Sequence, residues 1–146
     1  MPRLHHPALL LLASLLIACS PPDAEEIRTE PPAVKLPASV KQLAPDEAAA
    51  LIQSTPNLVI LDLREDWELK KQGRIANSRW ADFLNDERFS AATTKLSVDQ
   101  PTLLYCAIGG RSKLAAEKLT AKGFTQLFVL DGGLEAWLAS GKPVQK

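Results

Sequence analysis

The chain is expected to fold as an α/β protein, in which helices flank both faces of a central, mainly parallel sheet. Two observations predict this class. Short apolar runs, such as residues 58–61 and 101–105, have the length and the turn-rich borders of strands that are buried on both faces. These runs alternate with polar, helix-forming segments such as residues 112–122, and this alternation is typical of parallel strands joined by helices.

Five elements are expected in the first half of the domain: a strand at 40–43, a helix at 45–53, a strand at 58–61, a loop with a short helix at 62–72 and a short strand at 78–80. The first helix begins with Pro45 and two acidic residues, which favour a helix N-terminus. Thr55-Pro56-Asn57 ends this helix, and the apolar side chains that follow predict the second strand. Gly73 ends the short helix, as glycine commonly does.

The second half is expected to contain helical turns at 82–92, a strand at 101–105, a helix at 112–122, a strand at 126–130 and a helix at 134–140. The helix at 112–122 has the clearest pattern, because it is rich in Ala, Leu, Lys and Glu and ends at Gly123. Gly141 and Pro143 close the last helix. Ligands of parallel sheets bind at the carboxyl ends of strands, and Cys106 occupies such a position.

Composition restricts the classes of partner. Hydrophobic residues make up 46% and charged residues 23% of the 146 residues, which is typical of one globular domain with some non-domain sequence. Lys and Arg together number 17, as do Asp and Glu, and no long basic run is present, so we expect no nucleic-acid partner. The sequence also lacks a metal-ligand cluster, a dinucleotide fingerprint and a P-loop, so we expect neither a metal nor a cofactor.

Residues 1–18 resemble a bacterial lipoprotein signal peptide. A weakly basic start precedes an apolar run at 7–18, which is shorter than the roughly 20 residues of a membrane-spanning helix. The run ends in Leu16-Ile17-Ala18-Cys19, which resembles a lipobox. Cleavage before Cys19 and lipidation of its thiol would anchor the chain, because each buried methylene contributes about 0.8 kcal/mol. The alternative is an ordinary signal peptide with a chance cysteine.

This resemblance implies a lipoprotein of the bacterial cell envelope that faces the periplasm. Ser20 follows the cysteine, and the absence of an aspartate there favours the outer membrane. Residues 19–37 are expected to form the lipidated cysteine and a proline-rich tether, and residues 38–146 the folded domain. A disulfide between Cys19 and Cys106 is the competing interpretation, but one ends an apolar run and the other ends a strand.

Residues 106–112 carry the chemistry that we expect. Two glycines, Gly109 and Gly110, allow the loop after Cys106 to turn its backbone amides inward, and the next helix directs its positive end at the same place. Both effects favour the thiolate, which is the nucleophilic form of cysteine. Arg111 adds a forked donor that suits oxyanions. The alternative is a structural cysteine, buried as a small apolar residue.

Three segments, in the same order, are similar to motifs of the rhodanese family: Leu61-Asp62-Leu63-Arg64-Glu65, then Cys106, Gly109, Arg111 and Ser112 in the loop, then residues 130–144. The resemblance covers about residues 40–144. It departs from the family pattern between Gly73 and Asp82, where Arg74 and Asn77-Ser78 replace the usual residues. Arg74 is expected to be solvated. The resemblance implies a single rhodanese-like domain.

The resemblance also implies a sulfurtransferase. A sulfane sulfur would pass from thiosulfate or a persulfide donor to Cys106 as a persulfide, and then to cyanide or a thiol. The loop amides would stabilise that persulfide, Arg111 would orient the donor or hold the loop, and Ser112 would cap the helix. Ala107 and Ile108 offer no side-chain hydrogen bond to a donor. Asp62 and Arg64 are expected to form a buried polar network beneath the loop.

Other functions stay open at this stage. The domain could be a non-catalytic binding or sulfur-carrier module, or it could pass persulfide to a periplasmic thiol protein. The related phosphatases have one residue more between cysteine and arginine than the four here, Ala107 to Gly110. Loop length therefore favours sulfur over phosphate chemistry, but it does not separate a sulfurtransferase from an arsenate reductase.

Overall fold

The computed structural model describes residues 35–146. The predictions for the signal peptide, for Cys19 and for most of the tether lie outside these residues. Within residues 35–146, no helix is both long enough and apolar enough to cross a membrane.

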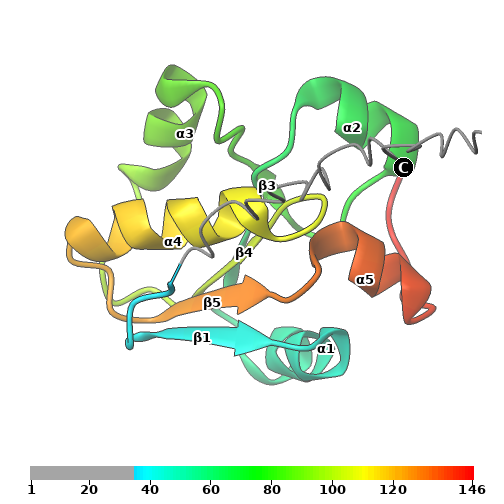
Figure 1. Cartoon of the computed structure of the whole chain (residues 1–146), viewed down its shortest axis with the longest axis horizontal. Coiled ribbons are helices and arrows are strands. Elements are labelled where there is room, and N and C mark those ends of the chain that lie inside the picture. Colours follow the sequence, from blue (N-terminus) through cyan, green and yellow to red (C-terminus); the bar gives the residue numbers. More distant parts are fainter. Residues whose placement is uncertain (1–34) are drawn as a thin grey trace, which may run out of the picture. The chain divides into compact units, whose positions relative to one another are not determined.

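The core of the fold is one five-stranded sheet (Figure 1). Its strands are β1 (Val40–Leu43), β2 (Val59–Asp62), β3 (Arg79–Trp80), β4 (Thr102–Tyr105) and β5 (Leu127–Leu130). The strand order is β1-β5-β4-β2-β3, and every neighbouring pair is parallel. All carboxyl ends therefore lie on the same edge of the sheet, as the alternation of strands and helices predicted.

Five helices accompany the strands: α1 (Pro45–Ser54), α2 (Asp66–Gln72), α3 (Asp86–Thr93), α4 (Gly110–Ala121) and α5 (Gly133–Ala139). Helices α1 to α4 connect successive strands, and α5 follows β5. Side chains of α3 and α4, such as Phe89 and Ala115, belong to one buried apolar cluster. Side chains of α1 and α5, such as Ala48 and Trp137, belong to a second cluster. The sheet lies between these clusters, which confirms the predicted α/β class with helices on both faces.

Strand β4 occupies the middle of the sheet, between β5 and β2, and all four of its residues are buried. Its side chains alternate between the two clusters, because successive residues of a strand point to opposite faces. Leu104 and Cys106 belong to the cluster beneath α3 and α4, whereas Leu103 and Tyr105 belong to the cluster beneath α1 and α5. Cys106 is thus held at the centre of the carboxyl edge.

Two helices begin two or more residues away from their predicted starts. Helix α3 begins at Asp86 instead of 82, because the Asn85 side chain accepts the Arg88 amide and caps the helix there. Helix α4 begins at Gly110, two residues before the predicted start. The sequence pattern predicted a start at Ser112, but Gly110 is already helical and Gly109 precedes it in a left-handed conformation.

The segment that departs from the family pattern has structural roles. Gly73 has φ +74°, and a Cβ there would lie 2.4 Å from the Gln145 carbonyl oxygen, so only glycine fits. Ser78 is buried, and Asn77 adopts a positive φ of 61°. Arg74 pairs through its backbone with Gln145, and its side chain is exposed, as predicted.

Candidate active site

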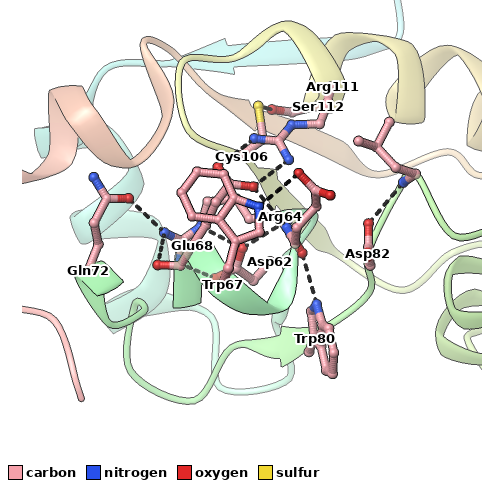
Figure 2. A network of polar contacts seen from close by, with 12 residues as sticks. Asp62, Arg64, Trp67, Glu68, Gln72, Trp80, Asp82, Cys106, Arg111 and Ser112 are labelled. Atoms are coloured by element: carbon pink, nitrogen blue, oxygen red, sulfur yellow. Dashed lines mark hydrogen bonds and ion pairs between the residues drawn. The ribbon is translucent and has the colours of Figure 1, made fainter. Parts of the chain in front are cut away.

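The Cys106 side chain lies just beyond β4 and is almost fully buried, with 1% of its surface exposed. Its sulfur accepts a hydrogen bond from the Gly109 amide at 3.2 Å. It accepts a second from the hydroxyl of Ser112, which lies beside Cys106 (Figure 2), at 3.2 Å. Donors that converge on a sulfur stabilise it as an anion. The Gly109 amide and the Ser112 hydroxyl are thus placed to bind negative charge that develops at the sulfur.

The turn from β4 into α4 depends on Gly109, which precedes the helix with φ +102°. Glycine adopts this conformation without the strain that a side chain would add. Ser112 was predicted to cap the helix, and this is wrong: the cap residue is Gly109, and the Ser112 hydroxyl instead contacts the Cys106 sulfur. The first amides of an α-helix have no acceptor within it, so the start of α4 adds further donors to the loop.

Helix α5 fixes the loop from the other side. The Leu134 amide donates to the Cys106 carbonyl at 2.8 Å, and the Glu135 amide donates to the Ala107 carbonyl at 3.0 Å. A Cβ at Gly133 would lie 2.5 Å from both carbonyl oxygens, so glycine permits this approach. Because these carbonyls point toward α5, the peptide groups at the start of the loop have a fixed orientation.

Arg111 is held by an acidic residue of α2. Its Nη1 lies 2.6 Å from Glu68 Oε2, and its Nη2 lies 2.7 Å from Glu68 Oε1. This bidentate pair raises the pKa of Arg111, chiefly through the hydrogen bond to Glu68. Burial alone would raise the pKa of Glu68, but the hydrogen bond and charge of Arg111 lower it below its ordinary value. Both side chains are therefore charged and paired at neutral pH.

Asp62 and Arg64 form the predicted network beneath the loop, and both side chains are 0% exposed. Arg64 Nε lies 2.9 Å from Asp62 Oδ1 and Nη2 lies 2.7 Å from Asp62 Oδ2, while Nη2 also donates to the Gly73 carbonyl at 2.7 Å. Burial alone would lower the pKa of Arg64, but Asp62 raises it. The two side chains therefore form a fully buried ion pair.

Tyr105 joins this network to the strand that carries Cys106. Its hydroxyl donates to Asp62 Oδ2 at 2.6 Å, accepts the Ile75 amide at 3.1 Å and lies 3.1 Å from the Ser78 hydroxyl oxygen. Burial, together with the charge of Asp62, raises the pKa of Tyr105, so the hydroxyl stays protonated. The residue immediately before the cysteine is thus fixed by hydrogen bonds on the opposite face of the sheet.

The geometry agrees with the comparisons to known proteins. Residues 44–140 match the family model of the rhodanese-like domain. The chain belongs to the rhodanese-like family. It is 32% identical over 97 residues to the thiosulfate sulfurtransferase GlpE of Pseudomonas fluorescens. The aligned region covers 66% of this chain and 84% of that protein. The family and this relative support sulfurtransferase activity in general terms.

Solved structures of rhodanese-like and related proteins share the fold. The polysulfide-sulfur transferase homodimer of Wolinella succinogenes is 27% identical, with a TM-score of 0.62 over 74% of this chain and 80% of that one. A Rhodopseudomonas palustris protein of unknown function, described as a possible tyrosine phosphatase, is 28% identical, with a TM-score of 0.63 over 73% of this chain and 86% of that one. The second similarity makes the distinction between sulfur and phosphate chemistry a question for the site itself.

The structure of this rhodanese-like domain brings the predicted loop residues together. Arg111 and Ser112 lie with Cys106 at one edge of the sheet, and Asp62 with Arg64 lies beneath them (Figure 2). Ile108, also in the loop, is 67% exposed. Within residues 35–146, no group of three or more His, Cys, Asp or Glu side chains is arranged to hold a metal ion.

Two residues of the site were missed from sequence. Glu68 lies 43 positions before Arg111, and nothing in its local sequence indicates that the two residues pair. Gly133 stands just before the helix predicted at 134–140; in the structure it is the first residue of α5 and lets that helix approach the loop. The glycine pair 132–133 was the available signal for the second residue, since adjacent glycines often mark close contact between backbones.

Proposed function

We propose that this protein transfers a sulfane sulfur from thiosulfate or a persulfide donor to a thiophilic acceptor through a persulfide on Cys106. The observation that supports this most directly is the environment of the sulfur. The buried Cys106 sulfur receives the Gly109 amide and the Ser112 hydroxyl, both at 3.2 Å. Donors in these positions stabilise negative charge on the sulfur, which is needed both for attack and for leaving.

The reaction divides into two displacements that need no external oxidant or reductant. The Cys106 thiolate attacks the outer sulfur of the donor; a new S–S bond forms, and the old bond breaks with its electron pair on the departing group. From thiosulfate the departing group is sulfite, and from an organic persulfide it is the thiolate. The acceptor, cyanide or another thiolate, then attacks the outer sulfur and releases the Cys106 thiolate.

The position of Arg111 argues against phosphatase or arsenate-reductase chemistry. In such a reaction the loop arginine would bind the oxyanion with its forked donors. Here both terminal nitrogens of Arg111 are engaged by Glu68, at 2.6 and 2.7 Å. The side chain would have to break this pair before it could clamp phosphate or arsenate. Sulfur transfer to Cys106 does not require that change.

The decisive experiment uses the purified full chain and its Cys106→Ala variant. Each is reduced, supplied with thiosulfate or cysteine persulfide, and analysed by intact mass for one added sulfur atom. Thiocyanate production from cyanide is measured in parallel. We expect a sulfur adduct that dithiothreitol removes, together with turnover, and we expect the variant to lose both.

Two other outcomes have clear meanings. If the folded, reduced protein gains no sulfur from either donor, the proposed function is wrong. If Cys106 gains sulfur but neither cyanide nor a small thiol removes it, the domain is a sulfur carrier that requires a protein acceptor. A periplasmic thiol protein is the partner to test in that case.

We also propose that lipidation of Cys19 anchors the domain to the bacterial envelope, facing the periplasm, and that the membrane is the outer one. The support is the sequence Leu16-Ile17-Ala18-Cys19 followed by Ser20. Metabolic labelling with a palmitate analogue should label the wild type and not Cys19→Ala, and density fractionation should place the labelled protein with outer membranes. An unlabelled wild type, or labelled protein in another fraction, would show which part of this proposal is wrong.

A further inference from the structure

The Arg111–Glu68 pair is a fixed part of the site. Only 7% of the Glu68 side chain and 21% of the Arg111 side chain are exposed, and the two meet through both oxygens and both terminal nitrogens. The Glu65 amide also donates to Glu68 Oε2 at 2.9 Å. The carboxylate is therefore positioned by its own helix as well as by the loop.

The pairing removes the net charge that Arg111 would bring to the loop. The other arginine of the site, Arg64, is neutralised in the same way by Asp62, and that pair is completely buried. The net charge of each ion pair is zero, and the attacking Cys106 thiolate adds one negative charge. Among the site groups named here, all within residues 35–146, the partial positive charge of the α4 N-terminus remains to attract an anion. A dianionic donor is therefore poorly compensated in this site.

Apolar groups border the same loop. Ile108, inside the loop, is 67% exposed, and Trp67, which precedes Glu68 in α2, is 59% exposed. The Trp67 indole N–H donates to the Glu65 carboxylate at 3.1 Å, which holds the ring (Figure 2). Exposed apolar side chains favour contact with the carbon atoms of an organic donor, and inorganic thiosulfate has none to offer.

We propose that Glu68 determines the choice of donor: by neutralising Arg111, it selects organic persulfides of low net charge, such as cysteine persulfide, over dianionic thiosulfate. This inference rests on the proposed sulfurtransfer and specifies its first step. The Cys106 thiolate attacks the terminal sulfur of R–S–SH. A new S–S bond to Cys106 forms, the S–S bond of the donor breaks with its electron pair on the leaving thiolate R–S⁻, and the proton stays on the transferred sulfur. Glu68 does not touch the reacting atoms; it is a specificity residue that acts through Arg111.

The test compares the two donors in the full chain with Glu68→Gln, with cyanide as the common acceptor. Glutamine keeps the shape and can still accept from Arg111, but it leaves the arginine charge uncompensated. We expect the ratio of kcat/KM for thiosulfate to that for cysteine persulfide to rise about tenfold, mainly through the KM of thiosulfate. The increase should shrink at high salt, because screening weakens the attraction. A change in Cys106 reactivity that affects both donors equally cancels in the ratio of the two kcat/KM values.

Two control variants separate charge from structure. Glu68→Asp keeps the negative charge and should keep the wild-type donor ratio. Asp66→Asn removes the same charge from the same helix, but Asp66 pairs with the exposed Lys70 and should leave the ratio unchanged. A thermal melt of each variant confirms that it is folded.

Several outcomes would overturn the proposal. A Glu68→Gln ratio within about twofold of the wild type, or equal losses with both donors, would show that Glu68 is only structural. The wild type alone provides an independent check: it must use cysteine persulfide at least about tenfold better than thiosulfate, whatever the fate of the variants. Failure of the proposed function looks different, because Cys106 would then gain no sulfur from either donor.

Discussion

At the scale of single residues, the Cys106 sulfur accepts hydrogen bonds from two donors of different kinds. The Gly109 amide belongs to the backbone and is present whatever the side chains are, whereas the Ser112 hydroxyl is contributed by one removable atom. Both lie 3.2 Å from the sulfur. Hydrogen bonds to an ionised group are stronger than those between neutral groups, so the hydroxyl is expected to contribute to the rate and not only to the packing.

Replacement of Ser112 by alanine tests this contribution. We expect the rate of sulfur transfer to fall about tenfold, because one hydrogen bond to an anionic sulfur is lost from both displacements. The measurement is a single-turnover assay of persulfide formation and discharge. Ser90→Ala, at an exposed position of α3, is the control. A Ser112→Ala rate equal to that of the wild type would show that the hydroxyl has no part in the reaction.

The Glu68–Arg111 pair makes a prediction about stability and pH. The folded pKa of Glu68 lies below its ordinary value of 4.5, so the pair stabilises the fold above that pH and loses its contribution as the pH falls through the folded pKa. The free energy of unfolding should therefore be larger for the wild type than for Glu68→Gln at pH 7, and the difference should shrink in acid. Urea titrations at pH 7 and at a series of acidic pH values measure the free energy of unfolding of both proteins. If the difference between them stayed constant as the pH fell, the prediction would be wrong.

At the scale of secondary-structure elements, the loop of Cys106 connects β4 to α4 and is hydrogen-bonded to α5. Strand β4 places Cys106, α4 supplies donors from its first turn, and the first amides of α5 bind the Cys106 and Ala107 carbonyls. Helix α2 completes the arrangement through Glu68. No one of these elements makes the site by itself, so a small displacement of α5 should disturb the loop as much as a change within it.

The pair of variants Gly133→Ala and Gly141→Ala tests the contact with α5. Both glycines have positive φ, +59° and +74°, but a Cβ at Gly133 would meet two loop carbonyls at 2.5 Å, while nothing lies within 4 Å at Gly141. Gly141→Ala should cost about 1 kcal/mol of stability from backbone strain alone, with normal sulfur transfer. Gly133→Ala should cost more than about 2 kcal/mol and abolish transfer. Equal losses of stability and activity in the two variants would contradict this.

At the scale of the whole molecule, the domain has two apolar clusters that share one sheet. Leu104 is buried beneath α3 and α4, and its neighbour Leu103 is buried beneath α1 and α5; both are 0% exposed. Because the central strand contributes to both clusters, loss of packing on one face should loosen the other. The described domain is therefore expected to unfold as a single cooperative unit.

Leu103→Ala and Leu104→Ala test this coupling. Each substitution should lower the free energy of unfolding by about 2–5 kcal/mol, the usual cost of removing a buried leucine side chain. Urea unfolding followed by tryptophan fluorescence and by circular dichroism should give coincident single transitions for both variants. Two separated transitions, or a loss of stability in only one variant, would show that the clusters are independent.

The class of fold and the place of Cys106 after a buried strand could be predicted from the sequence alone. Buried strands and amphipathic helices have local periodicities, and the Cys106 loop is a continuous segment, so neighbouring residues contain the necessary information. The buried Asp62–Arg64 pair was predictable for the same reason, because its members are two positions apart.

Only the tertiary structure decided which residues complete the site. Glu68 and Arg111 are 43 positions apart, as are Asp62 and Tyr105, and such pairs form only when the parallel strands bring their carboxyl ends to one edge. The role of Ser112 was misjudged because a serine near a helix start usually caps it, whereas here the cysteine sulfur lies within its reach. The residue that neutralises Arg111 could therefore not be found from sequence, because ion pairs depend on distance in space and not on separation along the chain.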